Sequence, residues 1–258
     1  MVDKSIIILC KNQFNYLKKS IPVLLNQNNV GKYEIVVVDS GSTDGTDNFL
    51  KNQKVILLKI KPEDFHFSKT FNWAAKQVDC EIIIRLSGDV IPIDNLFLYN
   101  LTKQFQDPEV AATYSRYILQ PNSDKVLPLN WPEKRFKPTS EIYQIDPKIF
   151  SKKSMMIKNN FVKLTNLAGG ACAIRKSVFD QRPFNTNLLE AEDAEYSFYL
   201  HHSGYKIGYS AEAKVIHEHE KIKLTPKTIK KLLLVYTIFL KEIANLHIKQ
   251  VLKNKTMI

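Results

Sequence analysis

Two apolar runs decide the fold class of this chain: Ser5-Ile-Ile-Ile-Leu-Cys10 and Glu34-Ile-Val-Val-Val-Asp39. Continuous runs of this length are typical of strands that are buried on both faces, as they are in parallel sheets. Two further runs, Val55–Ile60 and Glu81–Leu86, have a similar pattern. We therefore predict an α/β protein with a mainly parallel central sheet.

Helical spacing of apolar residues occurs between these runs. It predicts helices over Phe14–Leu25, with Pro22 as a kink or break, over Ser68–Val78 and over Ile93–Phe105. Alternation of strands and helices gives a Rossmann-like, doubly wound fold. The ligand site of such a fold lies at the carboxyl ends of its strands.

The alternation of predicted strands and helices ends near residue 116. Arg116–Phe161 contains five prolines and no clear period, which predicts a long functional loop or several short elements. After it, we expect a strand at Gly169–Ile174, a helix at Ala191–His202 and a strand at Ala213–His219.

Composition limits the class of protein. A chain of 258 residues with 44% apolar and 24% charged residues can form one large globular domain. The three cysteines, Cys10, Cys80 and Cys172, include no close pair, which favours reduced thiols and a cytoplasmic protein. The longest apolar run, Leu232–Leu240, is too short to cross a bilayer.

The net charge of +11 is concentrated at the C-terminus. Residues 221–258 hold nine lysines and one glutamate, whereas residues 1–220 are close to neutral. This distribution argues against nucleic-acid binding and predicts a tail that meets an anionic surface.

A basic amphipathic helix should follow Thr225-Pro226. One apolar stripe would consist of Ile229, Leu232, Leu233, Tyr236, Leu240 and Ile243. Two interpretations stay open. The helix lies peripherally on the inner face of the membrane, or it packs on the domain or against a second subunit in a homodimer.

Four stretches can carry chemistry. Asp39 follows a buried strand within Val38-Asp-Ser-Gly-Ser-Thr-Asp-Gly-Thr46, where a carboxylate can bind a ribose or a base edge, although a plain turn is the alternative. The second stretch, Leu86-Ser-Gly-Asp-Val-Ile-Pro92, offers one carboxylate, Asp89. One is sufficient for a divalent cation that a diphosphate also binds.

The other two stretches lie further along the chain. Glu192-Asp193 opens a helix, where the helix dipole keeps a carboxylate ionised and suited to general-base chemistry. His217 and His219 are two apart on a strand and therefore face one side. Both stretches also have non-functional explanations: acidic residues stabilise the start of a helix, and the two histidines could be solvated. No GxxxxGK or GxGxxG motif is present, which argues against NTP hydrolysis and dinucleotide binding.

In this order the motifs resemble the inverting family 2 glycosyltransferases of the GT-A fold, from about Ser5 to His219. The resemblance implies a catalytic domain over residues 1–220, with a nucleotide-binding half at about 1–115 and an acceptor-binding half at about 116–220. Residues 221–258 would form the C-terminal helical extension. The family's DxD motif is reduced to Ser87-Gly88-Asp89, which is similar to the rhamnosyltransferase-like branch.

The resemblance also implies roles for individual residues. Asp193 would be the general base, with Glu192 beside it, and Asp89 and His217 would bind Mg²⁺ or Mn²⁺. The nucleotide-sugar would contact Cys10, Asn12, Asp39, Ser42, Asn72, Ser87 and Asp89. The acceptor would contact Trp131, Gly170 and Arg175. Phe71 replaces an arginine of the family's pattern, so a guanidinium contact to the donor at that position is not expected.

The expected reaction is sugar transfer, with inversion, from a nucleotide-diphosphate donor to a hydroxyl of a glycan or lipid-linked glycan in surface polysaccharide assembly. Two alternatives stay open. One is a catalytically weak sugar-nucleotide-binding subunit. The other is a sugar-nucleotide pyrophosphorylase, although Leu9-Cys-Lys-Asn-Gln13 lacks the glycines that such an enzyme needs.

Overall fold

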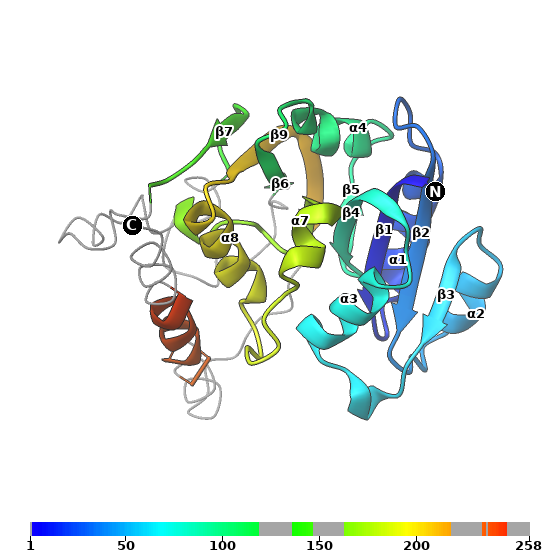
Figure 1. Cartoon of the computed structure of the whole chain (residues 1–258). Coiled ribbons are helices and arrows are strands. Elements are labelled where there is room, and N and C mark those ends of the chain that lie inside the picture. Colours follow the sequence, from blue (N-terminus) through cyan, green and yellow to red (C-terminus); the bar gives the residue numbers. More distant parts are fainter. Residues whose placement is uncertain (1, 119–135, 147–162, 218–233, 236, 247–258) are drawn as a thin grey trace.

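The four apolar runs of the N-terminal half form neighbouring strands, β3-β2-β1-β4 (Figure 1). Their bounds are Val2–Cys10 for β1, Tyr33–Asp39 for β2, Ile56–Lys59 for β3 and Cys80–Ser87 for β4. The computed structural model describes residues 2–118, 136–146, 163–217, 234–235 and 237–246. Strand β1 pairs in parallel with β2 and β4, and β2 pairs in parallel with β3. The predicted parallel arrangement is confirmed for this half.

The second half of the sheet is mixed. It contains β5 (Val90–Pro92), β6 (Val110–Ile118), β7 (Glu141–Tyr143), β8 (Ala171–Arg175) and β9 (Lys206–His217). Strand β8 lies antiparallel between β4 and β6, β6 and β9 are parallel, and β5 and β7 pair antiparallel with β9. The prediction of a mainly parallel sheet is too broad here. Continuous apolar runs report burial on both faces, and they do not report strand direction.

Helices cover both faces of the sheet, as predicted. On one face lie α1 (Phe14–Leu25), α2 (Thr46–Lys51) and α4 (Phe97–Thr102), and on the other lie α3 (Phe67–Ala75), α7 (Lys176–Gln181) and α8 (Glu192–His202). Two short 3₁₀ turns, Pro62–Asp64 and Lys103–Gln106, complete these layers. Each face has its own apolar core, which holds the loops at the strand ends in place.

Several predicted bounds change. Helix α1 continues through Pro22 to Leu25, so the proline does not end it. The helix predicted over Ile93–Phe105 begins only at Phe97, because Val90–Pro92 pairs with β9. The last predicted strand begins at Lys206, well before Ala213.

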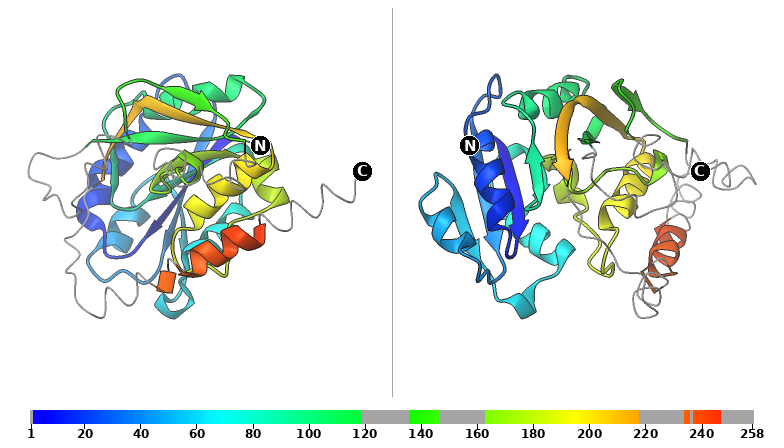
Figure 2. Two further views of the ribbon diagram at one scale, coloured as in Figure 1. Left: turned by 90° about the vertical axis from the view of Figure 1, so that its left-hand side faces the viewer. Right: turned by 180° about the vertical axis from the view of Figure 1, so that it is seen from behind.

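The C-terminal helix, residues 237–246, packs on the domain beside α8 (Figure 2). Phe239 and Ile243 are buried there against Leu188 and Phe198. Leu240, which the predicted stripe placed on the buried side, is 42% exposed. The stripe is therefore wrong at this position, since spacing alone does not fix which side of a helix meets the core. Residues 225–233 and Tyr236 lie outside the described residues.

None of the helices in the described ranges is long and apolar enough to serve as a membrane span.

Candidate active site

A cavity of about 450 Å³ opens at the carboxyl ends of β1 and β4, where the strand order predicts a ligand site. Its wall combines strand ends, the loop after β2 and the segment before α3. The lining residues include Leu9, Cys10, Ser40, Pro62, Phe65, Arg85, Ser87, Asp89, Gly170 and His217. A volume of this size is within the range of small-ligand pockets, roughly 300–1,000 Å³.

The predicted nucleotide-binding residues Cys10, Asn12, Asp39 and Ser42 form a corner next to this cavity, and of the four only Cys10 lines it. The Ser42 hydroxyl and backbone N–H both donate to the buried carboxylate of Asp39, and the Cys10 thiol lies 3.9 Å from it. Burial raises the pKa of that thiol, so it is neutral and can donate. The Asp39 carboxylate is thus held in a fixed orientation.

The same corner locks two loops together. Asn12 adopts a left-handed conformation, with φ of 54°, and its N–H donates to the Ser42 hydroxyl at 2.8 Å. Its side-chain oxygen accepts from the Thr43 N–H at 2.7 Å. Asn12 and Ser42 therefore brace the loops after β1 and β2, and neither lines the cavity directly.

Asn72 is placed differently from the prediction. Its amide donates to the Phe184 carbonyl at 2.8 Å, and its side-chain oxygen accepts from the Phe184 N–H at 3.2 Å. Both ends of the side chain thus hold α3 to the segment after α7. This bonding forms a structural clamp, and the predicted contact of Asn72 with the nucleotide-sugar stays a prediction.

Asp89 and His217 meet at the cavity wall because β5 pairs with β9, which brings Val90 opposite His217. The Asp89 Oδ2 lies 3.4 Å from the His217 Nε2, and the two side chains are 23% and 9% exposed. The His217 ring also stands edge-on to Tyr117, at 5.1 Å between centroids. The two predicted metal ligands therefore come together from separate parts of the chain.

These two atoms fit part of a divalent-cation shell. Neighbouring ligands of an octahedral ion with bonds of ~2.1 Å lie about 3 Å apart, which is close to the separation seen here. Within the described ranges, no group of three or more His, Cys, Asp or Glu side chains could hold an ion. Donor phosphate oxygens and water would have to complete the shell. His219 lies outside the described residues.

The dipeptide Gly169-Gly170 separates this pair from Asp193. A methyl group at Gly169 would come within 2.7 Å of the Asp193 side chain. One at Gly170 would come within 2.6 Å of the Tyr117 hydroxyl and 3.2 Å of the His217 ring. Only glycines fit between these groups, so the dipeptide brings the two sets of predicted residues close together.

Asp193 and Glu192 begin α8 and have different environments. The Asp193 Oδ2 accepts from the Gly169 N–H at 2.7 Å, and the side chain remains half-buried. Glu192 is buried and forms an ion pair with Arg85 at 2.5 Å. Asp193 is therefore partly exposed, whereas the Glu192 carboxylate is buried against Arg85; the catalytic roles of both residues stay predictions.

Arg85 is a cavity residue that sequence analysis missed. Burial opposes its charge and the carboxylates of Glu192 and Asp193 favour it, with the result that its pKa lies above the usual value. The guanidinium also lies over the rings of Phe71 and Phe184, at 5.7 and 5.2 Å. Its position inside the apolar run of β4 was the available signal, because a buried charge requires a partner.

Two predicted acceptor residues remain to be placed. Arg175 lies at the far end of β8 from the cavity, where its guanidinium donates to the carbonyls of Phe105, Asp107 and Val110. These hydrogen bonds hold the segment that leads into β6, and the acceptor role of Arg175 stays a prediction. Trp131 lies outside the described residues.

This arrangement is that of an α/β protein with a ligand cavity at the carboxyl ends of its strands, and comparison with known proteins assigns the family. A model of "Glycosyl transferase family 2" matches residues 5–182. The chain belongs to this family.

Two O-antigen chain rhamnosyltransferases are similar in sequence. RfbN of Salmonella typhimurium is 31% identical over 198 residues, which cover 76% of this chain and 60% of that protein. WbaN of Salmonella anatum is 30% identical over 188 residues, which cover 72% of this chain and 56% of that protein. The chain thus spans less than two thirds of the length of these relatives.

Solved structures share the fold. TarS of S. aureus in complex with UDP has a TM-score of 0.64 at 15% identity, over 93% of this chain and 65% of that one. The mannosyltransferase PcManGT of Pyrobaculum calidifontis, in complex with GDP-Man and Mn²⁺, has a TM-score of 0.59 at 16% identity. That match covers 90% of this chain and 62% of PcManGT. The GT-A glycosyltransferase fold expected from the motifs is confirmed.

Proposed function

We propose that this protein is a metal-assisted, inverting glycosyltransferase with Asp193 as general base. It would transfer a sugar from a nucleotide-diphosphate donor to a hydroxyl of a glycan or lipid-linked glycan. The observation that carries the proposal is the close approach of Asp193 to Gly169 and of His217 to Gly170, which puts the two side chains on either side of the dipeptide. A base and a leaving-group site close together are what a single displacement requires.

The leaving group would depart at the Asp89–His217 end of the cavity. A bound Mg²⁺ or Mn²⁺ would offset the charge that develops on the diphosphate. Asp89 and His217 would hold the ion, and the Ser87 and Asp89 loop would face the phosphates. The ribose or the base would bind where Cys10 lines the cavity, next to Asp39 and Ser42.

The acceptor hydroxyl would lose its proton to Asp193. The hydrogen bond from the Gly169 N–H orients the carboxylate and leaves Oδ1 available for the acceptor. Arg85 neutralises Glu192 next to it, so the base does not face a second unpaired carboxylate. No covalent enzyme intermediate is needed in this scheme.

The similarity to RfbN and WbaN supports rhamnose as the sugar and O-antigen assembly as the setting. We infer a nucleoside-diphosphate rhamnose donor, with thymidine diphosphate as the nucleotide to test first. The protein would act in the cytoplasm, on a lipid-linked glycan at the inner face of the membrane. Contact of the basic C-terminal segment with anionic lipid, and a homodimer, stay predictions.

The test is a transfer assay with Mg²⁺ or Mn²⁺ and a panel of nucleotide-sugars. Replacement of Asp193 by Asn should lower turnover by at least about 100-fold and should change donor affinity little. Asp180→Asn, an exposed aspartate that pairs with Lys176, is the matched control and should retain turnover. Near-normal turnover of Asp193→Asn would exclude it as the base.

The alternative of a catalytically weak binding subunit has one supporting feature, the reduced motif Ser87-Gly88-Asp89. Metal-dependent hydrolysis of a donor in the absence of acceptor would argue against it. Donor binding without turnover for every sugar in the panel would favour it.

A further inference from the structure

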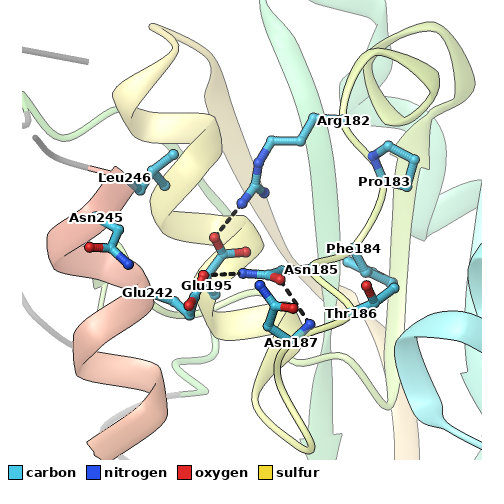
Figure 3. A pocket seen from close by; sticks show the side chains of 10 residues that line it. All are labelled: Arg182, Pro183, Phe184, Asn185, Thr186, Asn187, Glu195, Glu242, Asn245 and Leu246. Atoms are coloured by element: carbon cyan, nitrogen blue, oxygen red, sulfur yellow. Dashed lines mark hydrogen bonds and ion pairs between the residues drawn. The ribbon is translucent and has the colours of Figure 1, made fainter. Parts of the chain in front are cut away.

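A second pocket, of about 380 Å³, lies between the segment after α7, the first turns of α8 and the C-terminal helix (Figure 3). Its wall is mostly polar. The lining residues are Arg182, Pro183, Phe184, Asn185, Thr186, Asn187, Glu195, Glu242, Asn245 and Leu246. This pocket shares none of its lining residues with the cavity at the strand ends.

Two buried polar atoms of this pocket form no hydrogen bond of good geometry with the described residues, although the Asn185 amide also interacts with the Glu195 carboxylate. Glu195 is 1% exposed, and one of its carboxylate oxygens forms an ion pair with Arg182. Its other oxygen, Oε2, accepts no well-formed hydrogen bond in the described part of the chain, and the Arg182 Nη1 donates none. Figure 3 shows the Glu195 carboxylate between Arg182 and Asn185. One acceptor and one donor thus remain for a ligand, since buried polar groups usually have partners.

The charges of the pocket favour a neutral ligand. Glu195 and Glu242 would repel a phosphate or a carboxylate, and the ion pair of Arg182 with Glu195 leaves only the charge of Glu242 to attract a cation. The amides of Asn185, Asn187 and Asn245 can both donate and accept. A set of adjacent hydroxyl groups matches this mixture, because each hydroxyl also donates and accepts.

The C-terminal helix closes the pocket by specific contacts. The Asn185 amide donates to Glu242 of that helix at 2.8 Å, and Phe239 and Ile243 anchor the helix on Leu188 and Phe198. The pocket therefore exists because this helix packs on the domain. Its wall consists of residues that specific contacts hold in place.

The pocket and the active site stand on opposite sides of α8. Residues 193 and 195 of a helix point about 200° apart, at 100° per residue. Phe184 lines the pocket, and its ring contacts the guanidinium of Arg85, which lines the active-site cavity. These contacts form a shared wall between the two cavities.

We propose that this second pocket binds a neutral sugar unit, separately from the donor. A vicinal pair of hydroxyls would donate to the Glu195 Oε2 and accept from the Arg182 Nη1, with the asparagine amides around them. The inference that this sugar is part of the acceptor glycan, away from the reacting hydroxyl, rests on the proposed function. The inference that the pocket binds a sugar does not depend on the proposed function.

The experiment is saturation-transfer NMR with the methyl glycosides of rhamnose, mannose and galactose, each alone and with Mg²⁺ and excess nucleoside diphosphate. Asn245→Trp should fill the pocket from its exposed rim without removing a core contact. Ala244→Trp, at the neighbouring exposed position outside the lining, is the matched control. Thermal unfolding of each variant checks that it is folded.

We expect a saturation-transfer signal for at least one glycoside, and the signal should persist when the nucleotide is present. The signal should be lost in Asn245→Trp and retained in Ala244→Trp. No transfer to any glycoside, loss on addition of nucleotide, or an unchanged signal in Asn245→Trp would overturn the proposal. Asp193→Asn should still bind the glycoside. Binding by a protein that shows no transferase activity would contradict the proposed function and leave the pocket intact.

Discussion

The two halves of the active-site cavity are built in different ways. In the N-terminal half, the loops after β1 and β2 hold each other through Asn12, Asp39 and Ser42, all within the first 45 residues. In the C-terminal half, Asp193 and His217 depend on Gly169-Gly170, so three distant segments must fit together. The first corner is locally braced, and the second depends on tertiary packing. Single changes should therefore affect catalysis most in the second.

The largest effect should come from Gly169→Ala. The added methyl group would lie within 2.7 Å of the Asp193 side chain and would displace it. We expect turnover in the transfer assay to fall by about 100-fold or more, because misplacement of a catalytic group by 1 Å can have this effect. Donor affinity should stay close to that of the wild type.

Gly204→Ala is the control for this substitution. Gly204 has φ of 83° and nothing within 4 Å of an added methyl group, so the change strains the backbone without touching the site. It should lower stability by about 1 kcal/mol and spare turnover. Equal loss of turnover in the two variants would show that the Gly169 contact has no special part in catalysis.

The next effect concerns stability and tests the buried Arg85–Glu192 pair. Glu192→Ala would leave the Arg85 guanidinium charged, buried and unpaired. We expect urea unfolding to show a loss of about 3–5 kcal/mol. Asp180→Ala, which breaks the exposed pair with Lys176, should cost less than about 1 kcal/mol. Similar losses in both variants would mean that the buried pair does not hold α8 against β4.

The third prediction concerns pH and His201 on the buried side of α8. Burial lowers the pKa of His201 to about 4, and its Nδ1 accepts from the Ile145 N–H at 3.4 Å. The unfolded chain takes up this proton below about pH 6.5 and the folded chain only near 4. The contribution of the neutral ring is thus complete above pH 6.5 and is lost as the pH falls towards 4, by roughly 3 kcal/mol at most.

His201→Asn keeps an acceptor and removes this titration. The variant should be less stable than the wild type at pH 7, and the difference should shrink steadily between pH 6.5 and 4.5 in urea unfolding. Asn52→Ala, at the end of α2, removes no titratable group and serves as the control; its difference from the wild type should be the same at each pH. A constant difference for His201→Asn across this range would refute the prediction.

The smallest effect should come from the locally braced corner. Ser42→Ala removes the hydroxyl between Asp39 and the Asn12 N–H, while the Ser42 and Thr43 backbone contacts remain. We expect a loss of about 1 kcal/mol in stability and a fall in nucleotide affinity of less than about tenfold. Ser203→Ala, at the end of α8, is the control for affinity. Complete loss of nucleotide binding in Ser42→Ala would show that this corner is not braced by several independent contacts.

The predictions made from sequence succeeded where a pattern has a local cause. Continuous apolar runs identified β1 to β4, and the helix predicted over Ala191–His202, with an acidic cluster at its start, identified α8. Asn72, Glu192 and Arg175 were assigned roles by motif position, and the structure adds that each of them also holds two parts of the fold together. A motif gives the place of a residue along the chain, whereas the partner of its side chain comes from elsewhere in the fold.

By itself, the sequence determined the first four strands and the family, because apolar period and residue type are local properties; it also made Asp39, Asp89 and Asp193 the candidate carboxylates. Only the tertiary structure decided that β8 runs antiparallel between β4 and β6. It also decided that Arg85 neutralises Glu192 and that the C-terminal helix closes a polar pocket. These outcomes depend on which distant surfaces fit together, and packing of distant surfaces leaves no period in a single sequence.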